Sequence, residues 1–228
     1  MQSLLKSWRG KLPSPAERPG VIAVDGRSAG GKSTLAAFLH RAVPGSAVVH
    51  TDDIPSSGNW HGAALSASHL SDSTSPVGSF FDWTERLLEN VLVPARAGQA
   101  VRYRPQAWAD WFREEGAIEV PRGCPMLILE GVGAARRELM HVVDVVVWVQ
   151  SDIEQAETRG IARDGGDAEA AAFWEKWMAE EFPFLANQRP WERADAVVAG
   201  TPDLECDSTS QVVVAVQSLN TASGQQGS

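Results

Sequence analysis

Residues 26 to 34 constrain the fold of this chain more than any other stretch. They read Gly-Arg-Ser-Ala-Gly-Gly-Lys-Ser-Thr and contain the complete pattern G-x-x-x-x-G-K-[ST]. The apolar run Val21 to Val24 precedes them closely, and a segment with helical periodicity, Ser33 to Ala42, follows. A strand, a glycine-rich turn and a helix in this order form a phosphate-binding loop, in which successive backbone N–H groups point at a di- or triphosphate. The sequence therefore predicts a nucleotide site at a helix N-terminus.

Two side chains of this loop have predicted roles of their own. Lys32 can reach the β- and γ-phosphates of a bound nucleotide, and the hydroxyl of Ser33 is a typical ligand of the Mg²⁺ ion that accompanies them. The other loop residues are expected to surround the phosphates: Gly26, Arg27, Ser28, Ala29, Gly30, Gly31 and Thr34. ATP and Mg²⁺ are therefore the expected ligands. The alternative is a glycine-rich turn that binds nothing.

Length and charge narrow the class of partner. The chain has 228 residues, which suits one domain with a substantial core, and its formal net charge is −9. It has no basic stripe or arginine-rich arm that could neutralise a series of phosphates along DNA or RNA. A small nucleotide or metabolite is therefore a better partner than a nucleic acid.

The sequence favours a cytoplasmic location. Residues 1–9 lack the apolar stretch of a signal peptide, and no run of about eighteen apolar residues occurs, so neither secretion nor a membrane span is expected. Cys124 and Cys206 lie far apart and form no metal-type spacing, so both are expected to be reduced.

Apolar β-type runs alternate with helical patterns along the chain. This alternation predicts an α/β fold of the P-loop NTPase type, with three layers and a largely parallel sheet flanked by helices. The predicted strands are rich in Val, Ile and Leu and lie at 21–25, 47–51, 127–130, 142–149 and 196–199. Beyond the helix that follows the loop, helical patterns fall at 80–93, 152–164 and 168–181. Residues 211–219 are compatible with either a strand or a helix.

Three carboxylates follow strands that are predicted to neighbour the loop. Asp52 and Asp53 come after the second strand, at the edge where ligands collect in open α/β sheets. One of them could accept the proton of an attacking hydroxyl and the other could contact Mg²⁺ through water, unless both merely cap the next segment. Glu130 ends the run Leu127 to Leu129 and precedes Gly131, the layout of a Walker-B-like carboxylate that orients Mg²⁺. A strand that simply ends in an acid is the alternative for Glu130.

Arg159 and Arg163 lie four residues apart and share one face of the predicted helix 152–164. The pair Gly165-Gly166 follows them and could let this segment close over the phosphates as a lid. The arginines would then add positive charge at the transferring group, and the closed lid would exclude water. The alternative is that both arginines are solvated surface groups.

Candidates for the acceptor pocket lie between residues 54 and 111. An aperiodic stretch, 54–79, is longer than an ordinary connection and contains His61, which could also be simply solvated. The segment 102–111 is rich in rings and arginines, which could stack a base or sugar and grip a phosphate or carboxylate. Its candidates are Arg102, Tyr103, Arg104 and Trp108. Most of the nine Trp residues, including Trp148, Trp174 and Trp177, are expected to pack in the core.

Taken together, these motifs resemble the uridine kinase and phosphoribulokinase-like group of P-loop kinases, and more closely a set of bacterial uridine-kinase-like ATP-binding proteins. The resemblance covers about residues 20–200 and rests on the stretches V-I-A-V-D-G-R-S-A-G-G-K-S-T, T-D-D, L-I-L-E-G-V, R-G-I-A-R-D and A-D-A-V-V-A-G. It implies that Asp52 is the catalytic aspartate, Glu130 the acidic end of the Walker-B-like strand, and Arg159 and Arg163 the lid arginines. The chain departs from the group in having Ile54-Pro55 in place of an aromatic pair, a short lid and no evident nucleoside-specific β-hairpin.

The resemblance implies a Mg²⁺-dependent phosphotransferase that moves the γ-phosphoryl group of ATP to a small molecule. A nucleoside or nucleotide is the leading acceptor, and a sugar, a pantothenate-like acid or an antibiotic is the alternative among enzymes. The alternative of another class is a regulatory module that hydrolyses ATP slowly or not at all. The expected kinase domain spans residues 20–219, after an N-terminal helix and Pro-rich spacer at 1–19 and before a disordered tail at 220–228.

Overall fold

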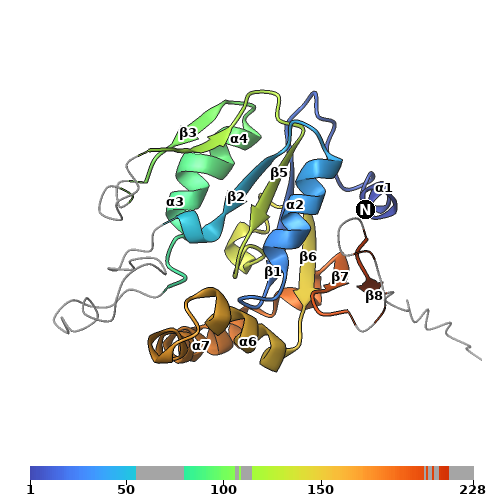
Figure 1. Ribbon diagram of the computed structural model, residues 1–228. Helices are drawn as coiled ribbons and strands as arrows, with labels where there is room; N and C mark the ends of the chain where they lie inside the picture. Colours follow the sequence, from blue (N-terminus) through green and yellow to red (C-terminus); the bar gives the residue numbers. More distant parts are fainter. Residues whose placement is uncertain are drawn as a thin grey trace, which may run out of the picture.

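The computed structural model describes residues 1–54, 80–105, 108, 115–202, 204, 207 and 211–215. Its centre is a six-stranded sheet in the order β2-β5-β1-β6-β7-β8 (Figure 1). The strands are β1 (Gly20–Gly26), β2 (Ala47–His50), β5 (Met126–Glu130), β6 (Val145–Gln150), β7 (Ala196–Ala199) and β8 (Val214–Ala215). Neighbouring strands from β2 to β7 are parallel, and β8 is antiparallel to β7.

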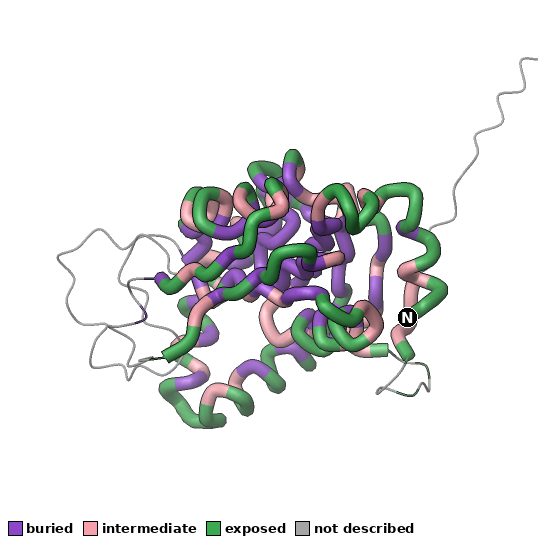
Figure 2. Tube along the Cα trace, turned by 90° about the horizontal axis from the view of Figure 1, so that it is seen from above, coloured by how far each residue is buried: buried purple, intermediate pink, exposed green. Residues whose placement is uncertain are grey.

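Helices cover both faces of this sheet, which confirms the predicted α/β class. One face packs against α2 (Lys32–Ala42) and the short N-terminal helix α1 (Gln2–Ser7). The other packs against a helical stretch made of α3 (Thr84–Leu87), a π-helical turn (Leu88–Leu92) and α4 (Val93–Arg96). Successive residues of β1 serve both cores, since Ile22 and Val24 face α2 while Val21 and Ala23 face the opposite side. Figure 2 shows the resulting buried centre inside an exposed outer layer.

Two further helices lie across the carboxyl ends of the strands (Figure 1). Helix α6 (Ile153–Arg163) and helix α7 (Ala168–Gln188) pack against each other there, each with an Asp side chain as its N-terminal cap. Helix α7 runs seven residues beyond its predicted end at residue 181. Pro183 interrupts one backbone hydrogen bond of the helix. The helix nevertheless continues beyond Pro183, because Leu185 and Gln188 in its last turns are buried.

Other predicted boundaries were wrong in ways that have physical reasons. The strand expected from residue 142 begins at Val145, because Val142 and Val143 form turn hydrogen bonds to Leu139. The helix expected at 80–93 spans 84–96, and Phe80 instead stacks on Trp177 with ring centroids 4.8 Å apart. An antiparallel pair, β3 (Val101–Tyr103) with β4 (Ile118–Val120), was not predicted because each strand is only three residues long.

Some expectations fall on residues outside the described part of the chain: His61 and the rest of 55–79, residues 106, 107 and 109–111 of the segment 102–111, Cys206, and 216–228. Cys124 is buried and its thiol is free. Among the described helices, none is both long and apolar enough to cross a membrane.

Asp144 fastens the N-terminal segment to the sheet. Both of its oxygens accept hydrogen bonds of 2.8 Å from the guanidinium of Arg18, and one also accepts the Val21 amide at 2.8 Å. Burial alone would raise the pKa of Asp144, but these bonds and the nearby Arg96 outweigh it and lower the pKa below its usual value. Trp8 is 2% exposed and packs in the same core as α2. The domain boundary at residue 20 stays a prediction.

We expect Asp144→Asn to destabilise the protein by about 2 kcal/mol at pH 7, because it removes the carboxylate charge that pairs with Arg18 and replaces one of the two oxygens that accept from its guanidinium. The lowered pKa means that this contribution is present above the unfolded-state pKa and disappears as the pH falls through the folded-state pKa. Urea unfolding at pH 7 and at about pH 3 should therefore show a smaller difference in the acid sample. Lys11 lies in the same N-terminal segment and forms an exposed ion pair with Asp195. Lys11→Gln breaks this pair and should lower the free energy of unfolding by at most about 1 kcal/mol. An equal loss from both substitutions would contradict the expectation.

Candidate active site

The phosphate-binding loop connects β1 to α2 and curls around the side chain of Lys32. The ammonium group of Lys32 donates to the carbonyl of Arg27 at 2.9 Å, and the residue is only 7% exposed. Gly31 caps α2 with a φ of 98°, a left-handed conformation that glycine adopts without strain. At Gly26 a side chain is excluded, since a Cβ atom would lie 2.6 Å from the carbonyl oxygen of Val149. The backbone conformation at Gly31 and the close approach of Val149 at Gly26 thus explain why glycine occupies these two positions of the loop.

Asp25, at the end of β1, holds the loop against the segment that follows β5. Its carboxylate is fully buried and accepts the amides of Gly26, Gly133 and Ala135 at 2.7, 3.0 and 2.9 Å. Burial raises the pKa of Asp25 to about 6, against the effects of these three donors and of Lys32. The carboxylate therefore fixes the loop relative to the end of β5, where Glu130 stands.

A cavity of about 280 Å³ opens beside the loop. It brings together residues from five parts of the chain: the loop, the end of β2, the end of β5, the end of α6 and helix α7. Its lining consists of Ser28, Ala29, Gly30, Gly31, Lys32, Ser33, Asp52, Glu130, Arg163, Asp164, Phe173, Trp174 and Trp177. Three of the predicted site residues outside the loop line this cavity: Asp52, Glu130 and Arg163. Asp53, which was also predicted, does not.

Glu130 lies between a histidine and the loop. Its Oε2 is 2.5 Å from Nδ1 of His50, the residue opposite it in the β2–β5 register, and the hydroxyl of Ser33 also bonds to it. Burial would raise the pKa of Glu130, but the bonds from His50 and Ser33 and the charge of Lys32 lower it overall. The same contact raises the pKa of His50. Glu130 is thus held as an anion facing the cavity. His50 was not predicted, although it directly precedes Thr51 and Asp52.

Asp52 is accessible to solvent but stands within the concave site, on a 3₁₀ turn that spans Thr51–Asp53. Reduced hydration raises its pKa, Lys32 opposes this effect and Glu130 adds to it. Asp53 does not line the cavity, and its carbonyl oxygen accepts the indole N–H of Trp108 at 2.9 Å. The geometry therefore gives Asp52, and not Asp53, the position in the cavity beside the loop.

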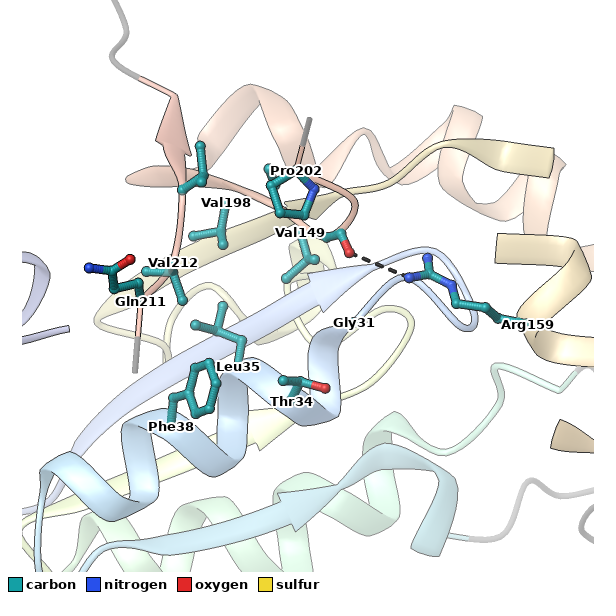
Figure 3. A pocket seen from close by; sticks show the side chains of 13 residues that line it. Gly31, Thr34, Leu35, Phe38, Val149, Arg159, Val198, Pro202, Gln211 and Val212 are labelled. Carbon is teal, nitrogen blue, oxygen red and sulfur yellow. Dashed lines mark hydrogen bonds between the residues drawn. The ribbon is translucent and has the colours of Figure 1, made fainter. Parts of the chain in front are cut away.

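A second pocket, of about 150 Å³, lies between α2, the ends of strands β6 and β7, and residues 211–213 (Figure 3). Apolar side chains from both sides face it, among them Leu35, Phe38, Val198 and Val212. Arg159 stands at its edge, 3.5 Å from the carbonyl oxygen of Gly200. The two arginines of the predicted lid therefore separate, Arg159 to this pocket and Arg163 to the cavity. Gly31 lines both spaces.

The described acceptor candidates lie away from both spaces. Arg102 forms an exposed ion pair with Glu119, and Arg104 donates to the carbonyl of Gly116 at 3.0 Å. Tyr103 is half-buried on β3, and burial raises its pKa. Trp108 is 1% exposed and belongs to the core on the α3 side of the sheet. Trp174 and Trp177 are also buried, as expected, but they line the cavity as well.

No family model matches the chain, and no curated protein matches it in sequence. Among solved structures, a "putative fructose transport system kinase" from a Silicibacter species has a TM-score of 0.53 and 21% identity, over 84% of this chain and 93% of that one. The chain has a P-loop kinase-like fold. A possible uridine kinase from Bacillus stearothermophilus has a TM-score of 0.49 and 19% identity, over 79% of this chain and 88% of that one.

This fold is the one that the resemblance in the sequence motifs implies. In such a fold the phosphate-binding loop, the end of β2 and the end of β5 meet at one edge of the sheet. This is why Lys32, Asp52 and Glu130, which are up to about a hundred residues apart, line one cavity.

Proposed function

We propose that the protein transfers the γ-phosphoryl group of ATP to a hydroxyl group of a small molecule, with a nucleoside or nucleotide as the leading acceptor. The observation that carries this proposal is the position of Asp52 in the same cavity as Lys32 and the loop amides. A protein that only binds a nucleotide needs the loop but has no use for a carboxylate with a raised pKa beside it.

The nucleotide would lie across both spaces of the site. Its base would fit the apolar pocket between Phe38 and Val212, with the flat guanidinium of Arg159 at the edge. Its phosphates would then follow the loop past Gly31 into the cavity, where backbone amides and Lys32 offset their charge. This placement uses loop residues 28–34, each of which lines at least one of the two spaces, whereas Gly26 and Arg27 line neither.

Asp52 would act as the base in the transfer step. It accepts the proton of the acceptor hydroxyl, whose oxygen forms a bond to the γ-phosphorus while the bond from phosphorus to the β–γ bridging oxygen breaks. The electron pair of that bond leaves with ADP. Arg163, whose pKa is raised chiefly by its bond to Asp164, can place its charge beside the equatorial oxygens.

Ser33 and Glu130 fit a Mg²⁺ ion. They offer a hydroxyl and a carboxylate oxygen, they are bonded to each other, and both face the cavity. Mg²⁺ at nucleotide sites takes one or two such protein oxygens in addition to phosphates and water. When bound, the ion would neutralise charge on the β- and γ-phosphates.

A panel of acceptors tests the proposal. Purified protein with Mg²⁺ and ATP should release ADP when one class of nucleosides, nucleotides, sugars or pantothenate-like acids is added, and the responding class identifies the acceptor. Slow release that no acceptor stimulates would favour a regulatory module instead.

We expect the segment 163–167 to close only when donor and acceptor are both bound. In the present state Arg163 is engaged with Asp164 at 2.7 and 2.9 Å, so it needs new partners to change its position. Hydrogen exchange should therefore show strong protection of these amides with acceptor plus a non-hydrolysable ATP analogue, and weak protection with either ligand alone. Full protection by the analogue alone would support a nucleotide sensor.

A further inference from the structure

Glu181 has no part in the transfer step proposed above, yet its carboxylate is fully buried against the phosphate-binding loop. Both of its oxygens are within hydrogen-bond distance of the Ser28 amide nitrogen, at 3.2 and 3.3 Å. Trp177, one turn earlier on α7, donates its indole N–H to Oε2 at 2.7 Å. Both partners are donors, which suits an ionised carboxylate.

Phe182, the residue after Glu181, makes a second contact between α7 and the loop. The guanidinium of Arg27 lies over the ring of Phe182, 5.1 Å from its centroid. Helix α7 therefore touches two consecutive residues of the loop, Arg27 and Ser28. The contact places a negative charge directly against a loop that is built to bind anions.

The place of Ser28 within the site decides which phosphate this charge affects. Gly31 lines both the apolar pocket and the cavity, whereas Ser28 lines the cavity alone. A nucleotide with its base in the pocket therefore extends its phosphates from Gly31 toward Ser28, and its terminal phosphate comes nearest to Glu181. Like charges repel more strongly in a partly enclosed site than in bulk water.

We propose that Glu181 determines how the loop discriminates between nucleotides by terminal charge: it weakens the binding of a nucleoside triphosphate relative to the diphosphate. It does so from α7, by holding the Ser28 amide and by repelling the terminal phosphate. This inference rests on the proposed function, because it takes ATP as the donor.

Glu181→Gln tests the role of the charge. The carbonyl oxygen of glutamine can take the position of Oε2, which accepts Trp177 and lies 3.3 Å from the Ser28 nitrogen, so both donors keep an acceptor while the charge is lost. The glutamine NH2 group then replaces Oε1, 3.2 Å from the Ser28 nitrogen, which is why Glu181→Met is measured as well. In calorimetric titrations at low salt, the dissociation constant of a non-hydrolysable ATP analogue should fall by about 3- to 10-fold and that of ADP by less than about 2-fold. The difference should shrink as ionic strength rises.

Glu180→Gln is the matched control. Glu180 lies on the same helix and also accepts a backbone amide, that of Phe80 at 2.9 Å, but it has no contact with the loop among its described hydrogen bonds. Its substitution should leave the ratio of the two dissociation constants unchanged. Melting curves of both variants verify folding, and Glu181→Met, which fills a similar volume without charge, gives a second measurement of the ratio if glutamine is not tolerated.

Two results would overturn the proposal in distinguishable ways. An unchanged ratio, or an equal change for both nucleotides, would leave Glu181 with a structural role only while the proposed function stands. A wild-type protein that binds neither nucleotide would overturn the proposed function and this inference together.

Discussion

Lys32→Ala should reduce ATP-dependent phosphoryl transfer by at least about 10³-fold while the protein remains folded. Lys32 is the one lysine that lines the described cavity, and it lies at the centre of the loop. Without Lys32, the phosphates would face the carboxylates of Glu130 and Asp52 in the same cavity. The main side chain that offsets these negative charges would then be missing. Turnover measurements give the effect, and circular dichroism verifies the fold.

Lys176→Ala is a suitable control for this substitution. Lys176 is exposed on α7 and does not line either described space, so its loss should leave turnover unchanged. Near-normal turnover of the Lys32 variant would refute the assignment of the loop as the donor site.

Asp52→Asn should lower the rate of transfer by about 10² to 10⁴-fold and leave the binding of Mg·ATP nearly intact, since a general base contributes to the chemical step and little to affinity. The raised pKa of Asp52 adds a second readout. The base must be ionised, so the wild-type rate should rise with pH through that raised pKa, and this limb should be absent in the variant.

Asp53→Asn provides the comparison for Asp52. Its side chain does not line the cavity, and the bond from Trp108 goes to its backbone carbonyl, which the substitution keeps. A milder effect is therefore expected. Loss of ATP binding in Asp52→Asn, or a larger effect at Asp53, would show that the two roles are assigned wrongly.

The sequence was informative wherever a site residue follows a strand at a fixed spacing. The loop, Asp52 and Glu130 each have a local pattern, and the order of parallel strands brings them to one edge. The contact of Glu181 with Ser28 joins residues 153 positions apart, and no local pattern indicates it. The pairing of His50 with Glu130 likewise depends on the β2–β5 register, which becomes evident only in the folded sheet.

The apolar pocket was missed for a similar reason. Its walls come from α2, the ends of β6 and β7, and residues 211–213. Residues 211–213 precede β8, in a stretch whose sequence pattern suits either a strand or a helix. Such a pocket is a property of packing between distant segments. The sequence also did not show that Arg159 and Arg163 line different spaces. They lie about one turn apart along α6, and each reaches the space nearest to its own turn.

The contact between Gly200 and the loop limits how this site can be redesigned. A Cβ atom at Gly200 would lie 1.9 Å from the carbonyl oxygen of Gly30, so main chain meets main chain there with no room for a side chain. Gly200 is therefore not a position at which a side chain could be introduced to alter nucleotide preference. New specificity has to be introduced at the outer walls, through residues such as Val212 on one side and Phe173 on the other.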